Sequence, residues 1–122
     1  MTEMIKKAWI TTPNRANRDH LAEVLKIVRR RGPPVIRAVP YPGNKNKKHW
    51  LALEGSHRIA AAKKLGLCVI IKVMRPHQRI RHDVNLGCLP QRTTVAKLVK
   101  ELQEDKSWRV CHWMSTLVIP PS

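Results

Sequence analysis

The sequence predicts a mixed α/β fold, in the α+β sense of a small mixed sheet with flanking helices. Two observations predict it. Short runs rich in β-branched residues recur along the chain, and segments with helical spacing of apolar residues lie between them. The chain has 122 residues, of which 43% are hydrophobic. That length and composition suit one domain with its own core, so residues 1–122 are expected to form a single domain.

The sequence of the longer first part of the chain predicts strands and helices that alternate. A helix over 20–31 has apolar residues at helical spacing and follows Asp19, which is its expected N-cap. Gly32 ends this helix, since Pro33 and Pro34 cannot continue it. The other expected elements are a helix over 56–65 and strands over 4–10, 35–39, 49–54 and 68–74.

Residues 75–122 are expected to form a C-terminal extension that packs on this first part. The beginning of the extension is basic and rich in turn residues, without a periodic pattern. A helix over 95–105 then follows Thr93 or Thr94, either of which can cap it. A last strand is expected over 108–119.

The chain is strongly basic, with 24 Lys and Arg residues against 8 Asp and Glu and a net charge of +16. Such an excess destabilises a compact chain through self-repulsion unless a polyanion lies nearby. Nucleic acid is the commonest such partner, and no basic amphipathic helix with a bulky apolar face favours a membrane surface. DNA is therefore the expected partner and no membrane partner is expected; a nucleotide and a second copy of the chain, as a homodimer, are the other partners considered.

Two further features indicate a cytoplasmic location. No apolar run approaches the roughly 18 residues of a membrane helix, and Met1–Ile10 lacks the apolar core and the cleavage site of a signal peptide. The three cysteines, Cys68, Cys88 and Cys111, suggest no paired framework, so reduced thiols are expected.

The segment Leu53–Leu67 carries the clearest local chemistry. Gly55 allows a sharp turn between a strand end and a helix, and Ser56 is the expected N-cap of that helix. The unpaired N–H groups of the first turn and the positive end of the helix dipole then suit an anion such as phosphate. Arg58 is the strongest candidate ligand, because a guanidinium binds phosphate in a bidentate manner, and His57 stands beside it.

This segment resembles the phosphate box of the ParB/sulfiredoxin superfamily. ParB proteins carry Gly-Glu-Arg-Arg there and sulfiredoxins carry Gly-Cys-His-Arg, where this chain has Gly55-Ser56-His57-Arg58, then Ala61-Ala62 and Leu65-Gly66. Upstream segments resemble the family in the same order: Asn14-Arg15, Leu21-Ala22-Glu23-Val24-Leu25 and Gly32-Pro33-Pro34-Val35-Ile36. The resemblance covers roughly residues 9–74 and implies a ParB/sulfiredoxin-like fold.

The resemblance implies a phosphate ligand held by Gly55, Ser56, His57 and Arg58. ParB proteins bind CTP through this box, so a nucleoside triphosphate, CTP or ATP, with Mg²⁺ is the implied cofactor, and DNA phosphate is the other implied ligand. Ser56 stands where sulfiredoxins have their catalytic cysteine. A serine cannot perform thiolate chemistry, so redox repair is rejected.

An enzymatic alternative is a Mg²⁺-dependent nucleotide hydrolase or DNA nuclease of the ParB-like superfamily. Glu54 would then hold the metal or act as a base, and His57 would be its catalytic companion. Glu54 can equally pair with Arg58 or a lysine, and a two-metal site needs several carboxylates where the whole chain has 8 acidic residues. A third reading is a protein that only assembles with a larger basic or nucleic-acid complex, in which the box is a structural relic.

Basic clusters outside this box are expected to contact nucleic-acid phosphates rather than serve only as a solvated face. They are Arg29, Arg30 and Arg31; Lys45, Lys47 and Lys48; and Arg75, Arg79 and Arg81. No motif for reading bases accompanies them, so sequence specificity is unsupported.

Two other groups of residues are interpreted as structural. A zinc site is not expected, because the spacing of the candidate ligands matches no finger or ribbon template. These candidates are His77, His82, Cys88, Cys111 and His112. Tryptophans are more often core than stacking platforms, so we expect Trp9, Trp50, Trp108 and Trp113 in the core.

Overall fold

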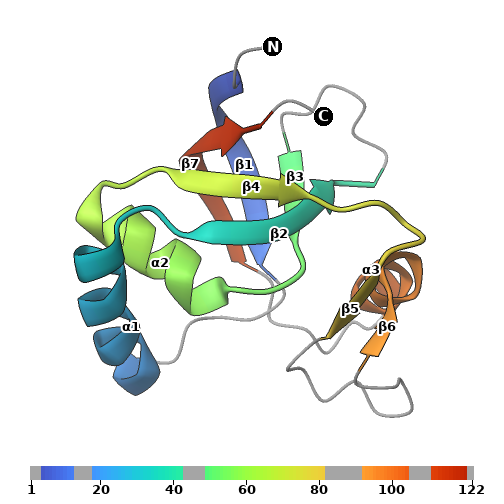
Figure 1. The fold of residues 1–122 in the computed structure, drawn as a ribbon, viewed down its shortest axis with the longest axis horizontal. Coiled ribbons are helices and arrows are strands. Elements are labelled where there is room, and N and C mark those ends of the chain that lie inside the picture. The colour runs from blue at the N-terminus through green and yellow to red at the C-terminus, as the bar shows by residue number, and fades with distance from the viewer. Residues whose placement is uncertain (1–3, 13–17, 43–48, 82–91, 105–110, 121–122) are drawn as a thin grey trace.

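The computed structural model of the chain describes residues 4–12, 18–42, 49–81, 92–104 and 111–120. In chain order its elements are β1 (Met4–Thr12), α1 (Arg18–Arg31), β2 (Val35–Pro40), β3 (His49–Ala52), α2 (Ser56–Leu65), β4 (Val69–Val73), β5 (Arg79–Arg81), β6 (Arg92–Thr94), α3 (Val95–Glu104) and β7 (Cys111–Ile119). Figure 1 shows their arrangement. Helices and a sheet of both parallel and antiparallel strands confirm the predicted mixed class.

The main sheet closes into a barrel in the order β1-β3-β2-β4-β7. β1 runs parallel to β3 and antiparallel to β7, whereas β2 is antiparallel to β3 and parallel to β4. The closing strand β7 pairs with β1 along its whole length and with β4 at two positions. The C-terminal part of the chain therefore supplies one of the barrel strands, in addition to packing on the outside.

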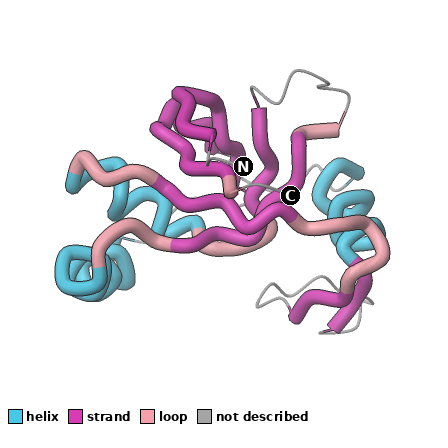
Figure 2. The backbone as a smooth tube through the Cα atoms, turned by 45° about the horizontal axis from the view of Figure 1, so that its top comes forward, coloured by secondary structure: helices cyan, strands magenta, loops and turns pink. Residues whose placement is uncertain are grey.

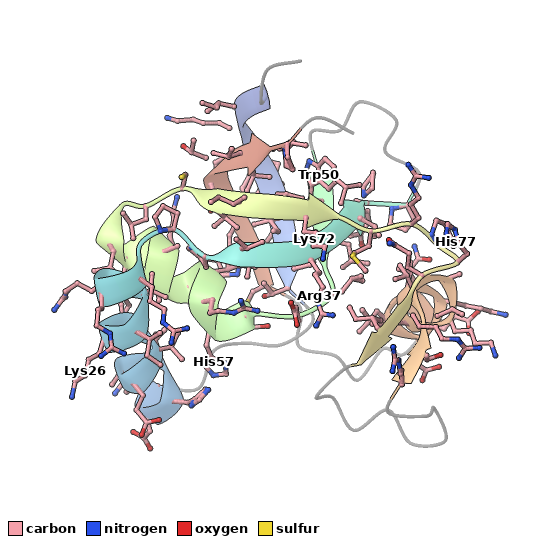
Figure 3. All side chains as sticks on the ribbon, in the orientation of Figure 1. Lys26, Arg37, Trp50, His57, Lys72 and His77 are labelled. Atoms are coloured by element: carbon pink, nitrogen blue, oxygen red, sulfur yellow. The ribbon has the colours of Figure 1, made fainter. Side chains whose placement is uncertain are left out.

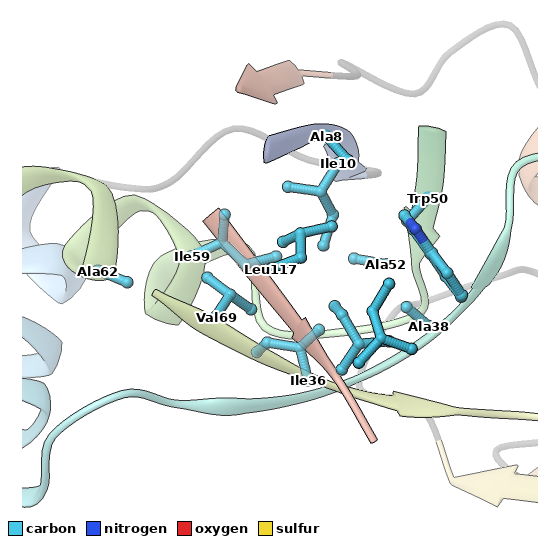
Figure 4. Packing of buried hydrophobic residues seen from close by; sticks show 12 residues of the cluster. Ala8, Ile10, Ile36, Ala38, Trp50, Ala52, Ile59, Ala62, Val69 and Leu117 are labelled. Atoms are coloured by element: carbon cyan, nitrogen blue, oxygen red, sulfur yellow. The ribbon is translucent and has the colours of Figure 1, made fainter. Parts of the chain in front are cut away.

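The barrel interior is filled by alternate residues of its strands, as the period of two along a strand requires. Ile10, Ile36, Trp50 and Leu117 are at most 1% exposed and meet there (Figure 4). Helix α2 adds Ile59 to the same cluster. Successive residues of a strand point to opposite sides, so the strand neighbours of these inward residues point outward from the barrel.

Two layers flank the barrel at opposite ends of the long axis. Helices α1 and α2 lie side by side at one end, and the small β5-β6 sheet with α3 lies at the other (Figures 1 and 2). Small Ala60 and Ala61 of α2 pack against the apolar stripe of α1, which allows a close approach of the two helices. At the other end, Leu98 of α3 and Ile80 of β5 pack on Leu51, which faces outward from β3.

The predicted elements are present with small changes in their ends. The helix predicted over 56–65 is confirmed at both ends, and Thr94 caps α3, since its Oγ1 accepts the Lys97 N–H at 3.4 Å. Asp19 is not an N-cap, because α1 begins at Arg18 and Asp19 lies in its first turn, where a carboxylate still complements the helix dipole.

The strands differ more from expectation. β1 continues to residue 12, β2 ends at 40, β3 ends at 52 because the chain turns toward α2, and β4 is limited to 69–73. The last predicted strand is observed from residue 111, and its first three predicted residues lie outside the described part of the chain. β5 and β6 were not predicted.

The tryptophans divide between core and surface. Trp50 is 1% exposed and confirms the expectation of a core residue, and Trp113 packs partly buried against the barrel. The prediction is wrong for Trp9, which is 44% exposed because it lies on the outward side of β1. Trp108 lies outside the described residues. Among those residues, no helix is long and apolar enough to cross a membrane.

Candidate phosphate and nucleic-acid site

The turn before α2 depends on a glycine. Gly55 has φ of 81°, in the left-handed region that only glycine enters at little cost. A Cβ at this position would lie 2.5 Å from Ile36 Cδ1, so a side chain there would also force the buried Ile36 to shift. The turn is pinned to β2, since the Leu53 N–H donates to the Arg37 carbonyl at 3.0 Å.

Ser56 is not the N-cap that the sequence predicts. Gly55 occupies the N-cap position and Ser56 is the first residue of α2, with no side chain capping the helix. An N-cap side chain reaches the N–H groups of the first turn from an extended backbone conformation, and the left-handed Gly55 replaces that conformation here. The start of α2 therefore keeps its N–H groups uncapped by any side chain, as an anion site requires.

Glu54 is held between two arginines. Its Oε1 accepts from Arg37 Nε at 2.8 Å and its Oε2 from Arg37 Nη2 at 2.5 Å, while Arg58 Nη2 lies 3.3 Å from Oε1. Burial acts to raise the pKa of the Glu54 carboxyl, but the hydrogen bonds and charges of Arg37 and Arg58 outweigh it and hold the pKa below its ordinary value. The predicted alternative, an ion pair with Arg58, is confirmed, and Arg37 is a partner that the sequence did not indicate.

Arg58 is fixed rather than free. Besides its contact with Glu54, its Nη1 donates to the Val35 carbonyl at 3.0 Å, which ties α2 to the first residue of β2. Its side chain is still 39% exposed. A guanidinium carries five N–H donors, so part of the donor set of this exposed side chain is left to solvent.

His57 lies against a second histidine. Its ring contacts His20 of α1 edge to face, with ring centroids 4.5 Å apart. Burial lowers the pKa of His57, and the charge of His20 lowers it further. The neutral imidazole is therefore favoured, which suits a hydrogen-bonding role beside a phosphate better than a charged one.

The side chains around Glu54 carry a net positive charge. Lys72 of β4 is the register partner of Arg37 on the neighbouring parallel strand, and both point outward from the barrel because Ile36 and Ile71 point inward. Figure 3 shows Arg37 and Lys72 on the same face of the molecule. Two arginines, Arg37 and Arg58, thus pair with one carboxylate, and Lys72 beside Arg37 adds to this excess of positive charge.

The structure separates the other predicted phosphate contacts into two groups. Arg29, Arg30 and Arg31 lie exposed in the last turn of α1, at one end of the molecule. Arg75 and Arg79 lie exposed at the other end, before and in β5, together with the backbone of Arg81. Lys45, Lys47 and Lys48 lie outside the described residues.

The candidate zinc ligands do not assemble within the described part of the chain. No group of three or more His, Cys, Asp or Glu side chains suited to a metal ion occurs there. His77 lies at the β5 end of the molecule, and His112 is hydrogen-bonded to Thr11 of β1. Cys111 is a free thiol, and His82 and Cys88 are not among the described residues.

A second polar cluster was missed by the sequence analysis. Thr11 Oγ1 lies 2.5 Å from His49 Nε2 and 2.7 Å from His112 Nδ1. Trp9 lines a shallow pocket of about 360 Å³ together with these two histidines. No local signal predicts the cluster, because its members come from three strands and meet only through the closure of the barrel.

Comparison with known proteins adds no relative. No protein-family model matches the chain, and no significant match was found among curated proteins or solved structures. The ParB/sulfiredoxin resemblance therefore stays a prediction carried by the residues of the Gly55–Arg58 box and the segments upstream of it.

Proposed function

We propose that this protein is a ParB-like nucleic-acid-binding protein that receives a phosphate of DNA, or of a nucleotide, at the start of α2. One observation carries the proposal: Arg37 and Arg58 both pair with the carboxylate of Glu54, at a helix start that no side chain caps, and Lys72 stands beside Arg37 on the neighbouring strand. A phosphate there would meet an excess of positive charge, backbone N–H groups that no side chain caps and the positive end of a helix dipole.

The fixed position of Arg58 supports the same role. Glu54 and the Val35 carbonyl hold the guanidinium in place, so ordering it against a phosphate costs little side-chain entropy. Glu54 thus acts as a positioning residue for Arg58. In many metal sites a ligating side chain is oriented in the same way, by a neighbouring residue that hydrogen-bonds to it.

The exposed arginines at the end of α1 favour a polymeric ligand over a small one. Arg29, Arg30 and Arg31 form no ion pair with any other residue that the structure describes. Unpaired exposed cations next to one another are costly in self-repulsion and are relieved by a polyanion. DNA, with one charge on every phosphate, provides such a ligand.

The Mg²⁺-dependent alternative has less support. Both carboxylate oxygens of Glu54 accept hydrogen bonds from Arg37, and Arg58 lies beside one of them. A metal ion or a proton taken up by Glu54 would have to displace these cations. CTP or ATP, with or without Mg²⁺, is therefore proposed as a second ligand of the phosphate site, and hydrolysis is not proposed.

The test is binding of a fluorescent DNA duplex measured by anisotropy at several salt concentrations, with CTP, ATP and GTP titrated by calorimetry. Arg58→Ala and Lys72→Ala are compared with Lys100→Ala, which removes the same charge from α3, and thermal melting checks that each variant folds. We expect DNA binding that weakens with salt, with a slope of about −0.9 for each phosphate contact. Arg58→Ala and Lys72→Ala should weaken it, and Lys100→Ala should leave it close to wild type.

Two results would count against the proposal. If neither DNA nor any of the nucleotides binds at low salt, nucleic acid is not the partner. Binding that Arg58→Ala, Lys72→Ala and Lys100→Ala reduce equally would show that net charge, and not the start of α2, holds the phosphate.

A further inference from the structure

Three strands bring a pair of histidines together on the outer face of the barrel. In the order β3-β1-β7, His49 is the register partner of Trp9, and Thr11 is the register partner of His112. Ile10 and Trp50 point into the barrel, so their neighbours Trp9, Thr11 and His49 point outward. The histidines, with ring centroids 5.8 Å apart, thus share one face with an exposed tryptophan.

A single hydroxyl links the two imidazoles. Thr11 is 2% exposed, and its Oγ1 is within hydrogen-bond distance of His49 Nε2 and of His112 Nδ1. The other ring nitrogens, Nδ1 of His49 and Nε2 of His112, have no hydrogen-bond partner among the described residues. They are the nitrogens left for a ligand.

The hydroxyl sets opposite roles for these two outer nitrogens. A hydroxyl donates one proton, so Thr11 donates to one neutral imidazole and accepts an N–H from the other. The imidazole that accepts from Thr11 carries its own proton on the outer nitrogen, and its partner carries a lone pair there. The pair therefore presents one acid and one base side by side, and moving the Thr11 proton exchanges the two roles.

We propose that His49 and His112, coupled through the Thr11 hydroxyl, form an acid–base pair that cleaves RNA by transferring a backbone phosphodiester to the adjacent 2′-hydroxyl. The pair needs no metal ion, because the nucleophile is part of the substrate and only proton transfers are required. The inference rests on the proposed function, which supplies the affinity for a nucleic acid. The cleavage itself is assigned to the histidine pair, which is separate from the start of α2.

The step balances within the pair. The base nitrogen takes the proton of the 2′-hydroxyl as the 2′-oxygen bonds to phosphorus, and the acid nitrogen gives its proton to the 5′-oxygen as the P–O5′ bond breaks. The inner N–H of the base passes its proton to Thr11, which passes its own to the other imidazole. Both histidines end neutral with their tautomers exchanged, and the products are a 2′,3′-cyclic phosphate and a 5′-hydroxyl.

The surroundings suit a single-stranded nucleic acid. Trp9 is 44% exposed and lines the pocket, where a base can stack on its ring. Tyr41 stacks on the His49 ring with centroids 4.1 Å apart, which holds that imidazole in one orientation. Burial, followed by the charge of His112, lowers the pKa of His49, and this favours the neutral form that the proton relay uses.

The experiment incubates the purified full chain, in EDTA, with a labelled single-stranded RNA, with DNA of the same sequence and with fully 2′-O-methylated RNA. We expect cleavage of RNA alone, with a 2′,3′-cyclic phosphate identified by mass spectrometry. His49→Ala and His112→Ala should each lower the rate by about 10²- to 10⁴-fold, the usual contribution of general acid–base catalysis. His77→Ala, an exposed histidine at the β5 end, is the matched control and should leave the rate unchanged.

Thr11 is tested as a positioning residue. Thr11→Val keeps the shape and removes the hydroxyl, so we expect slower cleavage with unchanged binding of the 2′-O-methylated RNA. Thr11→Ser restores the hydroxyl and should restore most of the rate. Circular dichroism and thermal melting are recorded for every variant, so that a loss of fold is recognised.

The outcomes separate this inference from the proposed function. Absence of RNA cleavage, while the 2′-O-methylated RNA still binds, would overturn the inference and leave nucleic-acid binding standing. Cleavage that persists when both histidines are replaced would also overturn it. Loss of binding to every nucleic acid would instead count against the proposed function.

Discussion

Gly55 decides the local geometry of the candidate phosphate site. Its positive φ turns the chain from β3 into α2, and its missing side chain lets Ile36 and Arg58 close over the turn. Gly32 has a positive φ as well, but a Cβ there would meet nothing within 4 Å. A side chain at Gly32 would therefore cause only backbone strain, whereas a side chain at Gly55 would cause the same strain and also crowd Ile36.

Replacement of Gly55 by alanine should destabilise the protein more than replacement of Gly32. Each change places an L residue in the left-handed region, which costs about 1 to 2 kcal/mol. Gly55→Ala adds an overpacking cost of about 1 to 3 kcal/mol against Ile36. The measurement is the free energy of unfolding from urea denaturation followed by circular dichroism. Equal losses in the two variants would mean that Ile36 gives way without cost.

At the residue scale the sequence predicts chemistry better than geometry. The Gly55 turn, the ion pair of Glu54 with Arg58 and the cap at Thr94 follow from residue types at short spacing. Ser56 shows the limit, because a good capping residue next to glycine leaves the helix start free to shift by one position. Arg37 is beyond such reasoning, since its partner lies 17 residues away on another element.

Among the secondary structure elements, α2 illustrates why some boundaries are predictable. A glycine stands at each end of the helix in the left-handed conformation, so the chain itself marks both limits. The three-residue strands β5 and β6 carry no such marks, and three residues are too few for a periodic pattern. Their pairing is also not local, because ten residues outside the described part of the chain separate them.

The strand β7 gives the element-scale prediction. Leu117 is fully buried in the barrel, whereas its neighbour Val118 points outward and is half-buried. Leu117→Ala should lower the free energy of unfolding by about 2 to 5 kcal/mol, as a cavity in a closed core does. Val118→Ala should cost about 1 kcal/mol, since less apolar surface becomes exposed to water. Urea denaturation of both variants is the measurement, and similar losses would contradict the placement of β7 in the barrel wall.

At the scale of the whole molecule, the barrel is the feature that the sequence could not predict. Alternation along each strand indicates which residues point inward, but not which strand lies next to which. The pairing of β1 with β7 joins the two ends of the chain, and that pairing brings Thr11 to His112. The histidine cluster therefore depends on topology, while the Gly55 turn and the Glu54–Arg58 ion pair of the proposed phosphate site are local enough to predict from neighbouring residues.

Topology also places two of the predicted basic clusters at opposite ends of the long axis. Arg29, Arg30 and Arg31 lie at the α1 end, and Arg75 and Arg79 lie beyond the barrel at the β5 end. Arg37 and Lys72 lie between them on the face formed by β2 and β4 (Figure 3). A ligand that contacts both ends must extend along this axis, so a nucleic-acid strand can reach both clusters, whereas a mononucleotide can reach only one site.

This distribution predicts two separable contributions to DNA binding. Alanine at all three α1 arginines should reduce the slope of log affinity against log salt by about 0.9 for each phosphate that the variant no longer binds. Alanine at Arg75 and Arg79 should reduce it independently, and the two effects should add because the ends lie far apart. The measurement is anisotropy of a duplex long enough to reach both ends, and a lysine triple variant at the α1 end is the control because it keeps the charge.

An unchanged slope in the alanine triple variant would show that DNA does not reach the α1 end. A weakening in the lysine variant as large as in the alanine variant would mean that guanidinium geometry, and not charge alone, binds the phosphates there.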